Sequence, residues 1–261
     1  MSEEVKNLFE NAHDEGLLSA ASIQALQVVD IGQQIQNGLG VSVDDVEASE
    51  VVLVTMMPDD SGSIRFSGNS QLVRDGHNIV LDALIKTKQK DNILAHCRYL
   101  NGTILYPFCP ISDAVKMTNS NYDPNLGTPL YDQTLVVLGT VLAKSQEFRD
   151  NGVPARTITL LITDGADEHS TKGNSKKVNA VVTDMLKMEN HIIAAMGIGD
   201  NDIFFKEIFQ EMGIPDEWIL TPGSSEKEIR KAFSVFSQSA SQASQSAANF
   251  SKAALGGFGT N

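Results

Sequence analysis

The chain has 261 residues, 41% of them hydrophobic and 20% charged, a composition typical of a globular protein with one full core and extensions. Its formal net charge of −13 argues against a nucleic-acid-binding surface, because such surfaces are basic. No apolar run is long enough to span a bilayer, and the acidic start lacks the pattern of a signal peptide. We therefore expect a cytoplasmic protein with neither nucleic-acid nor membrane partners, whose Cys97 and Cys109 are free thiols.

Residues 1–48 are expected to form an N-terminal helical extension. An amphipathic pattern over residues 5–12 predicts a short helix, and residues 22–36 predict a second one that ends near residues 37–40. The pattern leaves open whether these helices pack on the rest of the chain or dock to a partner.

From residue 51 onward, apolar strand patterns alternate with amphipathic helical patterns, which indicates an α/β fold with a mostly parallel sheet. The strand patterns are rich in Val, Ile and Leu on both faces, as in a sheet covered by helices on both sides. The expected strands cover residues 51–57, 93–99, 103–106, 157–163, 192–198 and 218–220. The expected helices cover residues 69–88, 130–149, 176–188 and 202–212, and a capping box at residues 225–228 opens the last one.

The joint between the second and third expected strands contains Asn101-Gly102, a strong signal for a tight hairpin. One edge strand should therefore run antiparallel to the others. At the far end of the chain, residues 237–261 are rich in Ser, Gln and Ala and poor in large apolar side chains. We expect a partly disordered tail whose first part can continue the last helix.

Oxygen-bearing side chains cluster where two of the apolar strands end. Asp59, Ser61 and Ser63 follow the strand at 51–57, Asp164 follows the strand at 157–163, and Thr128 precedes a helix. If the two strands are neighbours, these loops converge at the carboxyl edge of the sheet. Carboxylate and hydroxyl oxygens suit a hard cation, Mg2+ or alternatively Mn2+ or Ca2+. Because three of the five groups are neutral, the bound ion would remain electrophilic and attract a carboxylate from outside.

The pattern Asp-x-Ser-x-Ser at 59–63, then Thr128, then Thr-Asp-Gly at 163–165 resembles the metal-ion-dependent adhesion site (MIDAS) of von Willebrand factor A (vWA) domains. The hairpin and the Gly-Ile-Gly-Asp sequence at 197–200 are also similar to this family, and the resemblance covers residues 49–236. It implies a Rossmann-like fold with a six-stranded sheet, one antiparallel edge strand and helices on both faces.

The resemblance also implies roles for individual residues. Ser61, Ser63 and Thr128 would bind the metal directly, Asp59 would hold ligand waters and hydroxyls, and Asp164 would alternate between direct and water-mediated contact. Intracellular relatives often act as scaffolds with AAA+ ATPases or in stress-response complexes, which suggests such partners here.

Simpler interpretations exist for several of these residues. The 59–63 segment and Asp164-Gly165 also read as turns, and Thr128 before Pro129 reads as a helix N-cap. Asp60, where the family usually has a small residue, is expected to face solvent, and His169 to be a solvated loop residue. His77, His96 and Cys97 are expected in the core.

The function favoured by the sequence is a non-enzymatic, metal-dependent protein-interaction module that captures a partner's Asp or Glu. One alternative is a Mg2+-dependent phosphate-processing enzyme. However, Ser61 stands where the haloacid-dehalogenase pattern requires a second Asp, and residues 192–200 lack the Lys of a receiver domain. Another alternative is a structural assembly subunit with an idle metal site, in which the terminal segments drive assembly.

Overall fold

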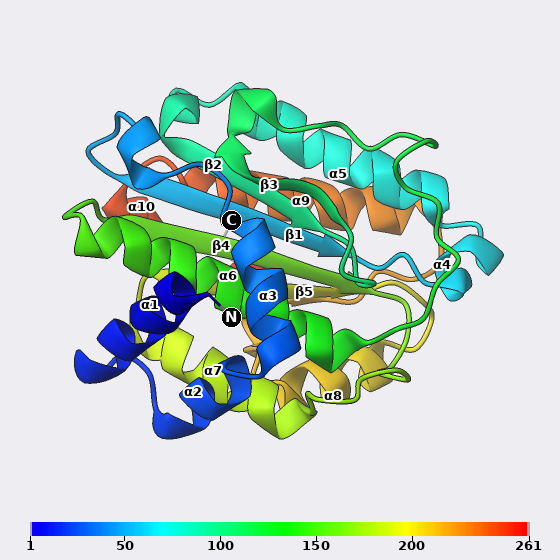
Figure 1. Ribbon diagram of the computed structural model, residues 1–261. Coiled ribbons are helices and arrows are strands. Elements are labelled where there is room, and N and C mark those ends of the chain that lie inside the picture. The colour runs from blue at the N-terminus through cyan, green and yellow to red at the C-terminus, as the bar shows by residue number, and fades with distance from the viewer. Residues whose placement is uncertain (1, 260–261) are drawn as a thin grey trace.

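A six-stranded sheet with the order β3-β2-β1-β4-β5-β6 lies at the centre of this computed structural model, which describes residues 2–259 (Figure 1). The strands are β1 Val51–Pro58, β2 Ile93–Arg98, β3 Ile104–Pro110, β4 Ala155–Thr163, β5 His191–Gly197 and β6 Ile219–Leu220. All neighbouring pairs are parallel except β2 and β3, which are antiparallel. The predicted α/β fold and the antiparallel edge strand are confirmed, and Gly102 in the hairpin adopts the positive φ (96°) that the turn requires.

Helices cover both faces of the sheet (Figure 1). The helices that follow the strands are α4 Gly62–Phe66, α5 Ser70–Ile85, α6 Leu130–Asp150, α7 Ser175–Lys187, α8 Asp202–Glu211 and α9 Glu226–Ala243. Helices α5 and α9 pack together on one face, while α6 and α7 lie on the other. Strands β1, β2, β4 and β5 are buried along their whole length, which explains why apolar residues predominate on both of their faces.

The strand order reverses between β1 and β4. From β1 the chain continues outward to β2 and β3, whereas from β4 it continues to β5 and β6 on the other side. In open α/β sheets, ligands bind at the carboxyl ends of the strands at such a switch point. The two predicted metal-binding strands are therefore neighbours at the position where this architecture places its sites.

The N-terminal residues form three helices, α1 Glu3–Asp14, α2 Ala20–Leu26 and α3 Val29–Gly38, which pack mainly on α6 and α7. The single helix expected over residues 22–36 is wrong, because the backbone at Val28 is extended (ψ 128°) and separates α2 from α3. The Asp184 carboxylate of α7 accepts hydrogen bonds from the Ser19 backbone and the Ser22 hydroxyl, both at 2.7 Å, and so fixes the start of α2.

The C-terminal segment is largely helical. Helix α9 begins at the expected cap, where the Ser225 hydroxyl accepts a hydrogen bond from the Glu228 backbone, and it extends to Ala243. A further helix, α10 Ala247–Gly256, lies in the region expected to be a partly disordered tail and buries Phe250. The outermost residues of both predicted extensions, Met1, Thr260 and Asn261, lie outside the described residues.

Other features of the described chain concern its burial and its connections. His77, His96 and Cys97 are fully buried, which confirms their expected place in the core, and both cysteines are free thiols. None of the helices within residues 2–259 combines the length and apolar character needed to cross a membrane. Short 3-10 helices complete the described elements at Val43–Asp45, Lys90–Asn92, Ile111–Asp113, Asp216–Trp218 and Gly257–Gly259.

Candidate metal centre

Four of the five predicted site residues lie in one hydrogen-bonded network at the ends of β1 and β4. Asp59 Oδ1 accepts a hydrogen bond from the Ser61 backbone at 2.7 Å, and the hydroxyl oxygens of Ser61 and Ser63 are 2.8 Å apart. The Ser63 hydroxyl donates to Asp164 Oδ1 at 2.6 Å. The other Asp59 oxygen accepts from the Thr163 hydroxyl at 2.7 Å. The network thus joins the loop after β1 to the loop after β4.

Thr128, the fifth predicted residue, reaches this region through its backbone. Its N–H donates to His169 Nδ1 at 2.9 Å, and its carbonyl accepts from the Glu168 N–H at 3.1 Å. Helix α6 begins at Leu130 with Pro129 as its N-cap and has no side-chain cap hydrogen bond. The interpretation of Thr128 as a capping residue is therefore wrong. The structure gives no hydrogen bond from its largely buried hydroxyl to the other four site residues.

Asp60 was expected to face solvent, but it is buried. Its side chain is only 3% exposed, because its carboxylate accepts hydrogen bonds from the backbone N–H of Asn101 at 3.0 Å and from the Asn101 amide. Its carbonyl accepts from the backbone N–H groups of Asn125 and Leu126. Asp60 therefore fastens the β1 loop both to the hairpin and to the segment leading to Thr128.

The electrostatics of the centre are dominated by unpaired carboxylates. Burial raises the pKa of Asp59 and, despite the Ser63 hydrogen bond, raises that of Asp164 to about 6. Burial likewise raises the pKa of Asp60 to about 7, in spite of the Asn101 backbone hydrogen bond, and the nearby Asp59 charge adds to this rise. None of the ion pairs among residues 2–259 includes these three carboxylates. Ionisation of these carboxylates is therefore unfavourable unless an opposite charge lies close to them, and such a charge would be stabilising.

These residues fit a hard divalent cation. The donors are carboxylate and hydroxyl oxygens, which Mg2+, Mn2+ and Ca2+ prefer, and His and Cys are absent from the predicted set. Asp59, Ser61, Ser63, Thr128 and Asp164 are the residues that would hold the ion. Its positive charge would offset the carboxylates that burial makes difficult to ionise, and its remaining coordination positions would take water or a carboxylate.

Three residues that the sequence did not single out for the site hold its loops in place. The buried Tyr122 donates its hydroxyl to the Asp59 carbonyl. His169 is exposed, as expected of a loop residue. Its Nδ1 also accepts a hydrogen bond from the Thr128 backbone N–H. The Asp132 carboxylate accepts from the backbone N–H groups of Thr171 at 2.9 Å and Lys172 at 3.0 Å, which clamps the loop carrying Asp164 to the first turn of α6.

Only a weak signal for these residues is present in the sequence. The signal is Gly127, next to Thr128, because an added Cβ at this position would lie 2.9 Å from the His169 ring. Such a close approach requires the two loops to be in contact, but the glycine alone does not name the partner.

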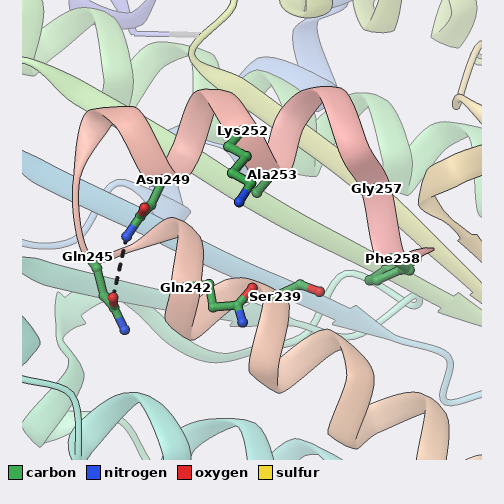
Figure 2. A pocket seen from close by; sticks show the side chains of 8 residues that line it. All are labelled: Ser239, Gln242, Gln245, Asn249, Lys252, Ala253, Gly257 and Phe258. Carbon is green, nitrogen blue, oxygen red and sulfur yellow. Dashed lines mark hydrogen bonds between the residues drawn. The ribbon is translucent and has the colours of Figure 1, made fainter. Parts of the chain in front are cut away.

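A separate groove of about 360 Å3 lies between α9 and α10, far along the chain from the site loops (Figure 2). Its lining is largely amide and hydroxyl side chains, with Lys252 and Phe258. The lining residues are Ser239, Gln242, Gln245, Asn249, Lys252, Ala253, Gly257 and Phe258. None of the five predicted metal ligands contributes to it.

The sequence matches no protein-family model and no curated protein. Solved structures are similar in fold. The pilus adhesin SpaC from Lactobacillus rhamnosus GG, in its open conformation, is 11% identical with a TM-score of 0.55, over 76% of this chain and 31% of the adhesin. The SpRpn10 VWA domain is 9% identical with a TM-score of 0.49, over 71% of this chain and 94% of that domain.

The chain spans less than a third of the adhesin that it matches. At this level of identity the likeness bears on the fold alone. Together with the strand order, it supports the Rossmann-like fold that the resemblance to vWA domains implies. The completeness of the metal site and an intracellular setting stay predictions.

Proposed function

We propose that this chain is a protein-interaction module that binds one divalent cation, Mg2+ or in its place Mn2+ or Ca2+, at Asp59, Ser61, Ser63, Thr128 and Asp164. The cation then captures an Asp or Glu side chain of a protein partner. The module acts by binding and not by catalysis.

The observation that carries the proposal is the network linking Asp59, Ser61, Ser63 and Asp164 at the switch point of the sheet. Burial disfavours the charged forms of both carboxylates, and no basic side chain among residues 2–259 forms an ion pair with them. A divalent cation supplies the missing positive charge. Two serine hydroxyls supply oxygen without neutralising it further.

The incomplete neutralisation explains why the partner should contribute a carboxylate. Mg2+ keeps several coordination positions for water or for oxygens from outside the protein. An incoming carboxylate replaces such a water and adds negative charge close to the ion. The same chemistry is available to any exposed Asp or Glu that can reach the carboxyl edge of the sheet.

The test is a Mn2+ titration followed by electron paramagnetic resonance, in which bound Mn2+ loses the signal of the free ion. We expect one saturable site in the wild type and at least about tenfold weaker binding in Ser61→Ala/Ser63→Ala. The control Ser112→Ala removes an exposed hydroxyl elsewhere and should bind as the wild type does. Mg2+ and Ca2+ are then measured by competition.

Carboxylate capture is tested on the Mn2+-loaded protein through the relaxation of water protons. Bound Mn2+ that retains water enhances relaxation, and acetate should lower the enhancement in a saturable manner by displacing water. If the wild type folds but binds no Mn2+, the metal-dependent function is refuted. Mn2+ binding without an acetate effect would refute carboxylate capture alone. Hydrolysis of a generic phosphate ester that Asp59→Asn abolishes would instead favour the phosphate-processing enzyme.

A further inference from the structure

Large apolar side chains are exposed around the candidate metal centre. Exposed large hydrophobic side chains among those that the structure describes include Phe66, Val115, Leu126, Ile203, Phe204 and Leu255. Four of them, Phe66, Leu126, Ile203 and Phe204, belong to segments that adjoin the carboxyl ends of the parallel strands. Val115 follows the antiparallel strand β3, and Leu255 lies on α10.

Two of the four are attached directly to the metal-site loops. Phe66, 90% exposed, ends the short helix α4 that begins right after Ser61 and contains Ser63. Leu126, 52% exposed, pairs with Ser61 in an isolated β-bridge and accepts a backbone hydrogen bond from Gly62 at 3.0 Å. Figure 1 shows α4 beyond the arrowheads of the strands. An exposed phenyl ring therefore stands beside the two candidate serine ligands.

The other two lie on the opposite side of the site. Strand β5 is the neighbour of β4, and Ile203 and Phe204 open the helix that follows it. Neighbouring strands are about 4.8 Å apart, so the segments after β1 and β5 are separated at the sheet edge by about 10 Å. Apolar side chains thus flank the loop of Asp164 from both sides.

The charges at this edge of the sheet indicate which charged residues a partner should carry. Exposed acidic residues lie in the segments next to this edge: Asp123 pairs with Arg65 of α4, Glu168 follows β4, and Asp200 and Asp202 follow β5. The exposed Arg65 is already paired with Asp123. A partner rich in acidic residues would be repelled everywhere except at the cation, whereas basic residues would be attracted by the rim.

We infer that the carboxyl edge of the sheet binds a peptide segment of a protein partner that has a single Asp or Glu flanked by large apolar residues, with Lys or Arg further out. The inference rests on the proposed function, because the cation holds the carboxylate. Phe66 and Leu126 contact the apolar residues next to it. Burial of one large side chain at an interface corresponds to a change in affinity of about tenfold or more.

The probe is a random 12-residue peptide library displayed on phage, selected on immobilised full-length protein in Mg2+ and eluted with EDTA. We expect the EDTA-eluted clones to carry one acidic residue with Phe, Leu, Ile, Met or Trp within two positions, and to be enriched in Lys and Arg elsewhere. The strongest clone is then made as a synthetic peptide, and its affinity for the variants is measured.

Phe66→Ser and Leu126→Ser should each lower the affinity for the peptide about tenfold and leave Mn2+ binding unchanged. The matched controls Val115→Ser and Leu255→Ser remove exposed apolar side chains elsewhere and should change neither. The inference would be overturned if the EDTA-eluted clones carried an acidic residue without enrichment in apolar residues. It would also be overturned if the peptide bound all four variants with equal affinity. Either result would leave the metal site intact. A protein that binds Mn2+ yet yields no EDTA-eluted clone also overturns it. Absence of Mn2+ binding refutes the proposed function itself.

Discussion

The hydroxyl of Ser63 donates a 2.6 Å hydrogen bond to the carboxylate of Asp164, although 101 positions separate the two residues in the chain. The bond closes the gap between the loops that follow β1 and β4. Because its proton is directed to the carboxylate, the Ser63 oxygen keeps lone pairs that can face a cation. The hydrogen bond therefore links two candidate ligands and orients the Ser63 hydroxyl so that its oxygen can bind a cation.

Replacement of Ser63 by Ala should reduce the stabilisation that a cation gives to the fold. A ligand that binds only the folded state raises the free energy of unfolding in proportion to the logarithm of its concentration over its Kd. We expect millimolar Mn2+ to raise the Tm of the wild type clearly and that of Ser63→Ala little, by differential scanning calorimetry. Ser112→Ala is the control, and an equal rise in both variants would contradict a role for Ser63 in binding.

His169 should position Thr128 through its Nδ1. Groups that orient metal ligands typically contribute about 10- to 100-fold to metal affinity. We therefore expect His169→Ala to weaken Mn2+ binding by about tenfold with little change in Tm, because the side chain is exposed. His169→Asn, whose side-chain oxygen can accept from the Thr128 N–H, should recover part of the affinity. Unchanged affinity in His169→Ala would show that the contact is dispensable.

Tyr122→Phe should destabilise the protein by about 1 kcal/mol, since it removes the hydroxyl that donates to the buried Asp59 carbonyl. Urea unfolding of the metal-free protein measures this difference. Tyr99→Phe is the matched comparison, because its hydroxyl also donates to a backbone carbonyl, that of Asn121, outside the site. Only Tyr122→Phe should also weaken Mn2+ binding.

Gly76→Ala should destabilise the fold by about 1–3 kcal/mol through overpacking. Helices α5 and α9 approach so closely that an added Cβ at Gly76 would lie 2.2 Å from the Phe233 ring. Urea unfolding tests this expectation. The double variant Gly76→Ala/Phe233→Leu should lose less than the sum of the single changes, and strict additivity would argue against a direct clash.

Acid should destabilise the protein through its buried histidines. Burial, followed by the charge of Arg149, lowers the pKa of His191 to about 3, and burial lowers those of His77 to about 4 and His96 to about 3. The unfolded chain, with a histidine pKa near 6.5, binds these protons more readily. The stability that each neutral histidine contributes is therefore present above about pH 6.5 and is lost as the pH falls towards the folded-state pKa.

The expected slope is about 1.4 kcal/mol per pH unit for each buried histidine in the middle of that range. Asp60 and Asp164 offset part of this loss, because their raised pKa values of about 7 and about 6 make the folded state take up protons there. His191→Gln should reduce the pH dependence of unfolding by one such slope. Identical pH profiles for His191→Gln and the wild type would contradict the assignment to His191.

Much of the fold follows from local sequence patterns. Buried strands such as β1 and β4 are rich in Val, Ile and Leu, and Asn101-Gly102 forms the expected hairpin. The loops that carry Asp59 and Asp164 could be placed together because parallel neighbours end at the same edge. The break at Val28 was missed because no Pro or Gly marks it.

The supporting contacts of the centre could not be predicted, because they join residues far apart in the chain. Asp60 finds Asn101 across 41 positions, and Tyr122 reaches Asp59 across 63. In the sequence Asp60 has only the appearance of a solvated turn residue. Its burial depends on how the hairpin folds over the β1 loop, which no local pattern specifies.

Helix α6 buries 16 of its 21 residues, because α1, α2 and α3 cover the side that a single layer of helices would leave to solvent. Its side chains on that side therefore lie in an interior environment. A fragment beginning near residue 49 would retain all the candidate ligands but expose this flank, and we expect it to aggregate. A domain transferred into another protein together with its metal centre should therefore include the first 48 residues.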